Sequence, residues 1–411
     1  MSDLKPIIPN PGAERDPSNF VGRADSTQHA LDMLEAKQNI LLSDPRRMGK
    51  TFWMQTFAHQ LNEGKQYKAV FVDYQGVNSI EEFLTKTARE LSNMKSLPNK
   101  FSDRLPVFFE NIDASLSLGP LTLKETVRAS GKTPIEVMEE ILTLLDHDLG
   151  NENKKTMLVI IMDEVSDAVL SIAEHKGESE AKNLLKRLRH LRSNTNNIRW
   201  IIAGSIGFHH VQTIIKASSD VINDLSNLRF GPLTKHDAEL LAKRLALGIN
   251  RPISDEALES VVTLTDAFPS LIQKLFGMMR YESDGSSAAE RPIEASEVEQ
   301  KLSDFIDDRD QSQDVTHYVT RIDQYYGNNT DIAQKILDYL AQSTEQVSFE
   351  DIRATAEKAL GSKFENNQLV AAYNNLLDDH YLVEQRADSI ITVTWKYPIL
   401  KRIYTRRRML G

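Results

Sequence analysis

A short segment near the start of the chain has the residue types of a phosphate-binding loop. Gly49, Lys50 and Thr51 follow an apolar run at 39–43 and begin a stretch with helical spacing. In this setting, backbone N–H groups and a helix N-terminus face phosphate oxygens. Gly49 would let the backbone approach phosphate closely. We expect Lys50 to place its charge on the β- and γ-phosphates, and the Thr51 hydroxyl to coordinate Mg²⁺.

One residue of this loop departs from the usual pattern, which has a first glycine five positions before the second. Asp44 stands at that position. A side chain there restricts the backbone, and a carboxylate beside phosphate is unfavourable unless it points away. Gly-Lys-Thr alone also fits an ordinary helix start.

A second candidate is the pair of acids after the apolar run at 158–162, namely Asp163 and Glu164. Acids at a buried strand end cost free energy unless they are paired or bind metal. In open α/β sheets, ligands bind at the carboxyl ends of strands. We expect Asp163 to hold Mg²⁺ through water, and Glu164 to orient and deprotonate an attacking water. The alternative is a core strand that ends in two solvated acids.

A third apolar run, at 199–203, is followed by Gly204 and Ser205. The Ser205 hydroxyl could hydrogen-bond a γ-phosphate or the attacking water, although serines after strands are common. Three strand ends with compatible chemistry together predict a nucleotide-binding site.

The elements that would position these residues alternate between apolar runs and helical spacing from about residue 20 to 230. Continuous apolar strands between helices predict a parallel sheet that is covered on both faces, hence an α/β P-loop fold. Within it, residues 93–150 form a long interval with a possible hairpin at 116–123. After residue 233 the pattern is helical only, and Thr234 with Asp237 predicts a capped helix start.

From residue 331 the pattern predicts three helices, at 331–342, 348–360 and 366–379, and then a hairpin of two strands. This is the order of a winged-helix fold. The third helix carries Asn and Gln but no Lys or Arg, so it offers little phosphate affinity. Residues 396–408 hold six basic residues and no acid. We favour a lid or protein-contact role, and DNA binding would depend on Lys396–Arg408.

Composition limits the function classes. The chain has 411 residues, no cysteine and a net charge of −10. The absence of cysteine excludes a disulfide scaffold and a thiolate metal site. The negative charge argues against binding nucleic acid over the whole surface. No apolar run of about 18 residues and no secretory signal is visible, so we expect a cytoplasmic protein that does not enter a membrane.

Taken together, the chain resembles an AAA+/STAND-type P-loop ATPase of the prokaryotic group that has a Phe-Val-Gly-Arg box before the P-loop. The motifs that carry the resemblance are Phe20-Val21-Gly22-Arg23, Pro45-Arg46-Arg47-Met48-Gly49-Lys50-Thr51, Asp163-Glu164, Gly204-Ser205-Ile206-Gly207 and Ala267-Phe268-Pro269. In the family, the first box lies against the adenine and the proline of the last approaches the nucleotide. Ala267 stands where that last box has glycine.

The resemblance implies ATP and Mg²⁺ as cofactors. It assigns Glu164, Lys50 and Ser205 to catalysis, and Thr51 and Asp163 to the metal. The nucleotide-binding residues that it implies are Phe20, Val21, Gly22, Arg23, Arg46, Arg47, Met48, Gly49, Lys50, Thr51, Phe52 and Pro269. The implied domains are an N-terminal arm (1–19), an ATPase core (20–230), a helical lid (231–312) and a winged-helix domain with a basic tail (313–411).

The activity implied by the resemblance is Mg²⁺-dependent ATP hydrolysis by a switch or assembly ATPase that acts through a partner protein, in a defence or mobile-element system. The alternative is an ATP-gated DNA-binding regulator with little turnover. Homo-oligomers are also expected, because an arginine in such families completes the neighbouring subunit's site. Arg187, Arg189 and Arg192 are the candidates.

Overall fold

A computed structural model describes residues 4–11, 16–94, 132–151, 156–281, 285–308, 313–361, 364–387 and 390–409. The expected hairpin at 116–123 lies outside these residues. The chain forms two compact units. The first contains Arg23–Ser43 and Lys50–Phe230, and the second contains Met1–Gly22, Asp44–Gly49 and Gly231–Gly411.

The first unit is built on a five-stranded sheet in the order β2-β3-β4-β1-β5, and every neighbouring pair is parallel. Its strands are β1 (Asn39–Leu42), β2 (Tyr67–Asp73), β3 (Met157–Asp163), β4 (Ile198–Ala203) and β5 (Leu225–Asn227). The predicted parallel α/β P-loop fold is therefore confirmed. The sequence had not indicated β5.

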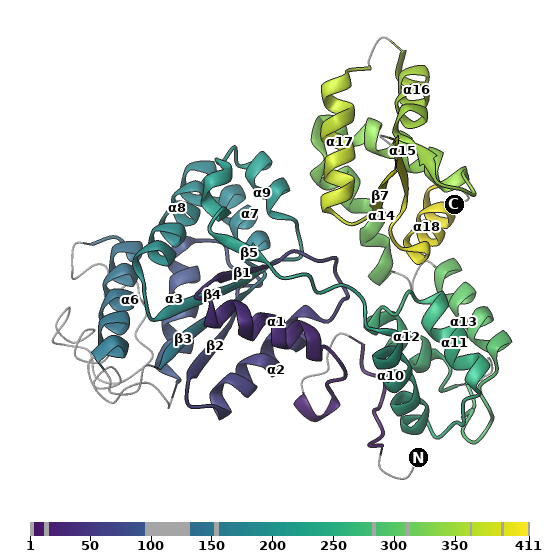
Figure 1. Cartoon of the computed structure of the whole chain (residues 1–411), viewed down its shortest axis with the longest axis horizontal. Coiled ribbons are helices and arrows are strands. Elements are labelled where there is room, and N and C mark those ends of the chain that lie inside the picture. Colours follow the sequence, from purple (N-terminus) through teal and green to yellow (C-terminus); the bar gives the residue numbers. More distant parts are fainter. Residues whose placement is uncertain are drawn as a thin grey trace. The chain divides into compact units, whose positions relative to one another are not determined.

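Helices cover both faces of this sheet (Figure 1). One face carries α1 (Ala24–Glu35) and α2 (Lys50–Glu63). The other carries α3 (Ile80–Ser92), α6 (Pro134–Asn151), α7 (Val165–Lys176), α8 (Glu178–Asn194) and α9 (Phe208–Ile214). Burial on both faces explains why β3 and β4 are almost entirely apolar. Helix α6, from the expected insertion, packs against α3 and α8.

The order of the strands decides which strand ends are neighbours. Strand β4 lies between β1 and β3, with Leu42 opposite Ala203 and Met162 opposite Ile202. Parallel strands end on the same edge of a sheet. The residues that follow β1, β3 and β4 therefore meet at one edge, as the sequence predicts.

The second unit contains the helices α10 (Lys235–Gly248), α11 (Asp255–Leu264), α12 (Pro269–Met278) and α13 (Ala295–Asp307). Thr234 caps α10 by accepting a hydrogen bond from the Asp237 N–H, as predicted. The N-terminal arm also belongs to this unit. The Ile7 N–H donates to the Arg244 carbonyl, and the Arg244 guanidinium donates to the Lys5 carbonyl.

In the C-terminal part of this unit, the described residues form α-helices and a small antiparallel sheet in the order β6-β8-β7. Its helices are α14 (Gln313–Tyr325), α15 (Thr330–Gln342), α16 (Phe349–Leu360), α17 (Asn366–Asp378) and α18 (Pro398–Tyr404). Its strands are β6 (Val347–Ser348), β7 (Leu382–Ala387) and β8 (Ile390–Trp395). The sequence did not predict α14 or α18.

The basic segment after β8 is helical, since α18 is followed by a π-helical turn at Thr405–Met409. Short 3₁₀ turns occur at Pro17–Asn19, Ser219–Ile222 and Gly327–Asn329. Among the described residues, no helix has the length and apolar character needed to cross a lipid bilayer.

Candidate functional site

The first unit brings together the residues expected to hold a metal ion. Thr51 lies in the first turn of α2 and Asp163 is the last residue of β3. The Thr51 hydroxyl donates to Asp163 Oδ2 over 2.6 Å. Burial raises the pKa of the Asp163 carboxyl, and the hydrogen bond from Thr51 and the charge of Lys50 oppose this rise.

This pair fits Mg²⁺ by its chemistry. A hydroxyl and a carboxylate supply the hard oxygen atoms that Mg²⁺ prefers, and Mg²⁺ usually keeps several waters beside one or two such ligands. The Asp163 side chain is buried, and a buried carboxylate gains from a cation. Thr51 and Asp163 would hold the ion together.

Glu164 lies beside this pair and contacts the loop after β4. Its backbone is left-handed (φ 56°) at the N-cap position of α7. Its carboxylate oxygen Oε2 accepts a hydrogen bond from the Ser205 N–H over 3.1 Å. Burial, together with the neighbouring Asp167, raises the pKa of Glu164 to about 8. The structure thus brings Glu164 and Ser205 together, while Glu164 favours its neutral form near neutral pH.

Asp167 is a site residue that the sequence analysis missed. It lies in the first turn of α7, and Asp167 Oδ2 accepts hydrogen bonds from Ser205 Oγ over 2.5 Å and from Ser166 Oγ over 3.3 Å. The spacing of Glu164 and Asp167, one helical turn apart, was the available signal. Because the Ser205 hydroxyl donates to Asp167, its oxygen faces any ligand as an acceptor.

The close approach of α7 and β4 depends on Gly204. A Cβ atom at this position would lie 1.9 Å from Ser166 Oγ. The Ser166 side chain is completely buried, and its hydroxyl accepts from the Ile206 N–H over 3.3 Å. The glycine therefore allows the segment that carries Ser205 to lie directly against the start of α7.

Three contacts of the second unit hold the loop Asp44–Gly49. The Gly231 N–H donates to Asp44 Oδ1 over 3.0 Å, so this carboxylate has a backbone partner. The Tyr318 hydroxyl donates to the Arg46 carbonyl over 2.6 Å. A Cβ atom on Gly49, which has φ 83°, would lie 3.7 Å from Pro269 Cγ. Pro269, singled out in the sequence, is thus next to the P-loop glycine.

The four residues at 20–23 are packed closely within their respective units. Gly22 has φ 77°, and a Cβ atom there would lie 2.5 Å from Asp237 Cγ, so a larger residue would strain the backbone and displace the Asp237 side chain. Arg23 is buried; it donates to the Phe230 carbonyl over 2.6 Å and stacks over the Phe230 ring at 3.9 Å. Ala267 has φ 55°, a conformation that glycine adopts readily, as the family's glycine at this position would.

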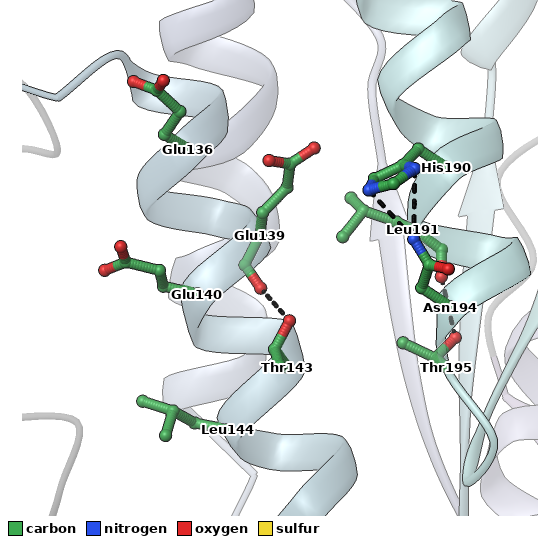
Figure 2. A pocket seen from close by; sticks show the side chains of 9 residues that line it. All are labelled: Glu136, Glu139, Glu140, Thr143, Leu144, His190, Leu191, Asn194 and Thr195. Carbon is green, nitrogen blue, oxygen red and sulfur yellow. Dashed lines mark hydrogen bonds between the residues drawn. The ribbon is translucent and has the colours of Figure 1, made fainter.

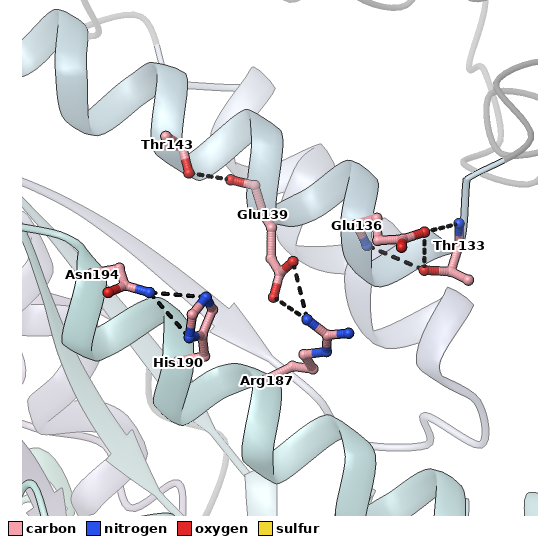
Figure 3. Close-up of polar contacts among 7 residues, drawn as sticks. All are labelled: Thr133, Glu136, Glu139, Thr143, Arg187, His190 and Asn194. Atoms are coloured by element: carbon pink, nitrogen blue, oxygen red, sulfur yellow. Dashed lines mark hydrogen bonds and ion pairs between the residues drawn. The ribbon is translucent and has the colours of Figure 1, made fainter.

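The three candidate arginines on α8 differ in how firmly they are held. Arg192 is buried and donates to both carboxylate oxygens of Asp224, so its charge is used within its own chain. Arg189 donates to Asp220 over 2.6 Å. Arg187 makes longer contacts, of 3.3 and 3.5 Å, to Glu139 on α6 (Figure 3).

Beside Arg187, a groove of ≈ 520 Å³ lies between α6 and α8 (Figure 2). Its lining residues are Glu136, Glu139, Glu140, Thr143, Leu144, His190, Leu191, Asn194 and Thr195. Asn194 and Thr195 come just before the start of β4, whereas Ser205 follows its end. The groove therefore opens toward the edge of the sheet opposite the candidate site.

Several of the basic residues at 396–408 have partners within the second unit. Arg406 pairs with Asp307 over 2.6 Å, and Arg407 donates to the Asp308 carbonyl over 2.9 Å. Others contact neutral groups: Lys396 with His380, Lys401 with the Ser343 carbonyl and Arg408 with Gln334. The acidic end of α13 and the basic C-terminal helix thus meet.

Comparisons with known proteins place the chain in a family and identify structures that share its fold. A family model described as an ATPase domain predominantly from Archaea matches residues 20–275. A Walker-type ATPase of Pyrococcus abyssi is similar in structure, with a TM-score of 0.61, 18% identity and 98% of each chain covered. This similarity shows a shared fold.

Two other solved structures are more distant. The ORC2 protein of Aeropyrum pernix, solved with ADPNP and ADP, has a TM-score of 0.47 and 13% identity, with 97% of this chain and 93% of that chain covered. The RuvB Holliday junction branch migration motor of Thermotoga maritima has a TM-score of 0.40 and 14% identity, with 96% and 97% covered. No curated protein matches the sequence.

Proposed function

The chain belongs to the family of ATPase domains predominantly from Archaea and is thus an ATP-binding P-loop ATPase of the AAA+ type, and on this premise we propose a finer function. The chain is a Mg²⁺-dependent switch or assembly ATPase of the STAND type that acts through a partner protein. The observation that carries this proposal is the 2.6 Å contact between Thr51 and Asp163, with Glu164 and Ser205 in contact beside it.

Each residue has a role in this proposal. Lys50 carries its charge to the β- and γ-phosphates, while Thr51 and Asp163 hold Mg²⁺, which when bound neutralises charge on the phosphates. Glu164 orients a water and takes its proton as the water oxygen attacks the γ-phosphorus. The bond between that phosphorus and the bridging oxygen breaks, and ADP keeps the bridging oxygen.

Glu164 must be ionised to act as a base, but burial beside Asp167 raises the pKa of Glu164 to about 8. A cation at Thr51 and Asp163 would lower this pKa, because a nearby positive charge favours the carboxylate. The base would therefore ionise when the metal is bound. This supports a site that is inactive until the metal arrives.

We further propose that Phe20–Arg23 lies against the adenine and that Pro269 approaches the nucleotide. Met48 and Phe52 complete that site. In a homo-oligomer, Arg187 or Arg189 would reach the neighbouring subunit's site, whereas Arg192 is held by Asp224.

The elements β6, β7, β8 and α15–α17 form the proposed winged-helix module, which we assign to contact with a partner protein in a defence or mobile-element system. The alternative, an ATP-gated DNA-binding regulator, has less support. Its basic residues in α18 and the following turn contact groups of the same chain.

ATP turnover with Mg²⁺, measured over a range of protein concentrations, tests the proposal. Wild type should hydrolyse ATP with a rate per subunit that rises with concentration, and Glu164→Gln should lose at least ~100-fold. Glu174→Gln is the matched control, because Glu174 is an exposed acid on the same helix α7. Equal turnover in Glu164→Gln and wild type would contradict the assignment of the base.

A further inference from the structure

A buried tyrosine from the C-terminal part of the second unit contacts the backbone of the P-loop. Tyr318 lies on α14 and is 4% exposed, and its hydroxyl donates to the Arg46 carbonyl over 2.6 Å. The sequence separation is 272 residues. This contact has no part in the proposed hydrolysis described above.

Because a peptide bond is planar, the contact from Tyr318 to the Arg46 carbonyl also fixes the direction of the next N–H group. In a trans peptide, the carbonyl of one residue and the N–H of the next point in opposite directions. No cis peptide bond occurs among the described residues, so the Arg46 carbonyl that faces Tyr318 directs the Arg47 N–H away from it. Arg47 and Gly49 both have positive φ, 70° and 83°, and such alternation turns successive N–H groups inward in anion-binding loops.

Tyr318 itself is held firmly. Its carbonyl accepts a hydrogen bond from the Tyr381 hydroxyl, at the start of β7. One turn further along α14, Arg321 forms a buried ion pair with Asp379. The Tyr326 hydroxyl, just beyond α14, donates to the same Asp379 over 2.9 Å. Of these contacts, the one from Tyr381 holds the Tyr318 backbone directly, and it makes the Tyr318 hydroxyl a rigid donor.

We propose that Tyr318 is a positioning residue for phosphate recognition: it holds the Arg46–Arg47 peptide so that the Arg47 N–H faces the phosphate chain of a nucleoside di- or triphosphate. This inference rests on the proposed function, since it needs a nucleotide in the loop. It also assigns the C-terminal part of the chain a role in the affinity of the nucleotide site.

The test is the affinity of the full chain for ATP, ADP and adenosine, measured by calorimetry for wild type, Tyr318→Phe and Tyr326→Phe. Tyr318→Phe should weaken ATP and ADP about three- to tenfold, the loss expected for one hydrogen bond. Adenosine affinity should not change. Tyr326→Phe is the matched control, because it removes a buried hydroxyl that is bonded to Asp379 instead of the P-loop.

The outcomes separate the two proposals. No ATP binding by wild type would overturn the proposed function itself. With wild type binding, unchanged ATP affinity in Tyr318→Phe would overturn the positioning role. Equal losses in Tyr318→Phe and Tyr326→Phe, or an equal loss for adenosine, would overturn it too, since the effect would then be one of general packing.

Thermal unfolding without nucleotide shows whether Tyr318→Phe is folded. A second variant tests the proposal independently of that result. Tyr381→Phe leaves the Tyr318 hydroxyl intact but frees its backbone. It should give a smaller loss for ATP and ADP and none for adenosine. Unchanged ATP affinity in a folded Tyr381→Phe would contradict the rigid support that the proposal requires.

Discussion

The chemistry of the site depends on three acids within one helical turn. Asp163, Glu164 and Asp167 lie at the end of β3 and the start of α7, where burial raises the pKa of Asp163 and of Glu164. Neighbouring like charges disfavour the ionised form of a carboxyl. Glu164 is therefore the acid of this site with the strongest tendency to keep a proton, since its pKa is raised to about 8.

This has a measurable effect on stability. Between its ordinary pKa of 4.5 and its folded pKa of about 8, Glu164 binds more protons in the folded state than in the unfolded state. Stability therefore falls as pH rises across that window. Glu164→Gln lacks this penalty, so it should gain on the order of a few kcal/mol over wild type between about pH 6 and pH 9.

Urea unfolding of both proteins, with EDTA and without nucleotide, measures this difference. Glu174→Gln, which changes an exposed acid of the same helix, should follow wild type at every pH. A constant difference between Glu164→Gln and wild type across this range would show that Glu164 is ionised throughout.

At the scale of elements, the sequence predicted the strands that consist of long apolar runs. Strands β3 and β4 are buried on both faces, so their composition was sufficient. Strand β5 has three residues, none of them fully buried, and it gave no signal. Helix α7 has Glu164 at its N-cap position, but the Glu164 side chain makes no capping hydrogen bond, so no usual capping residue marked the start of the helix.

The missed functional contacts have a different cause. Asp167 accepts a hydrogen bond from Ser205, which lies 38 residues later in the chain. Only the packing of α7 on β4 brings these two residues together. Tyr318 reaches Arg46 across 272 residues. The P-loop residues were predictable because their chemistry is local, whereas these two partners depend on tertiary packing.

The close packing of α7 on β4 predicts that one added methyl group at Gly204 lowers the stability of the protein. Gly204→Ala would place Cβ 1.9 Å from Ser166 Oγ and 2.7 Å from Ser166 Cβ. Such overpacking should cost about 1–3 kcal/mol of stability. The displaced Ser205 should also lower ATP turnover.

Thermal unfolding with a matched glycine checks this prediction. Gly277 lies in α12, where a Cβ atom would meet only Pro9 Cβ at an ordinary 3.8 Å. Gly277→Ala should therefore stabilise the protein by up to ~1 kcal/mol through helix propensity. Adding Ser166→Gly to Gly204→Ala should recover part of the loss. If Gly204→Ala is as stable as wild type, the close packing described here is wrong.

At the scale of the whole molecule, basic residues at 396–408 contact groups of the same chain. The net charge is −10, yet the segment 396–408 holds six basic residues and no acid. There, Arg406 and Arg407 contact Asp307 and Asp308, at the end of α13 and just after it. A basic cluster that faces its own acids has less affinity for phosphate than its composition indicates.

We therefore expect this segment to give only weak binding to duplex DNA at about 150 mM salt, since arginines that face their own acids replace few counterions. Fluorescence anisotropy with a labelled duplex, with and without ATP, measures this. Asp307→Asn, which frees Arg406, should increase the affinity at low salt. Tight binding by wild type, with a steep salt dependence, would support the DNA-binding alternative.

The order of the strands also determines when the protein can fold during synthesis. Strand β1 ends at residue 42, but its two neighbours in the sheet, β4 and β5, are made about 160 and 185 residues later. The N-terminal arm pairs later still, because the Ile7 N–H bonds to the Arg244 carbonyl. Such non-local pairing is slow and leaves apolar strands unprotected. The nascent chain therefore emerges with its phosphate-binding strand unpaired until about half of the protein exists, and chaperones have most to protect in that interval.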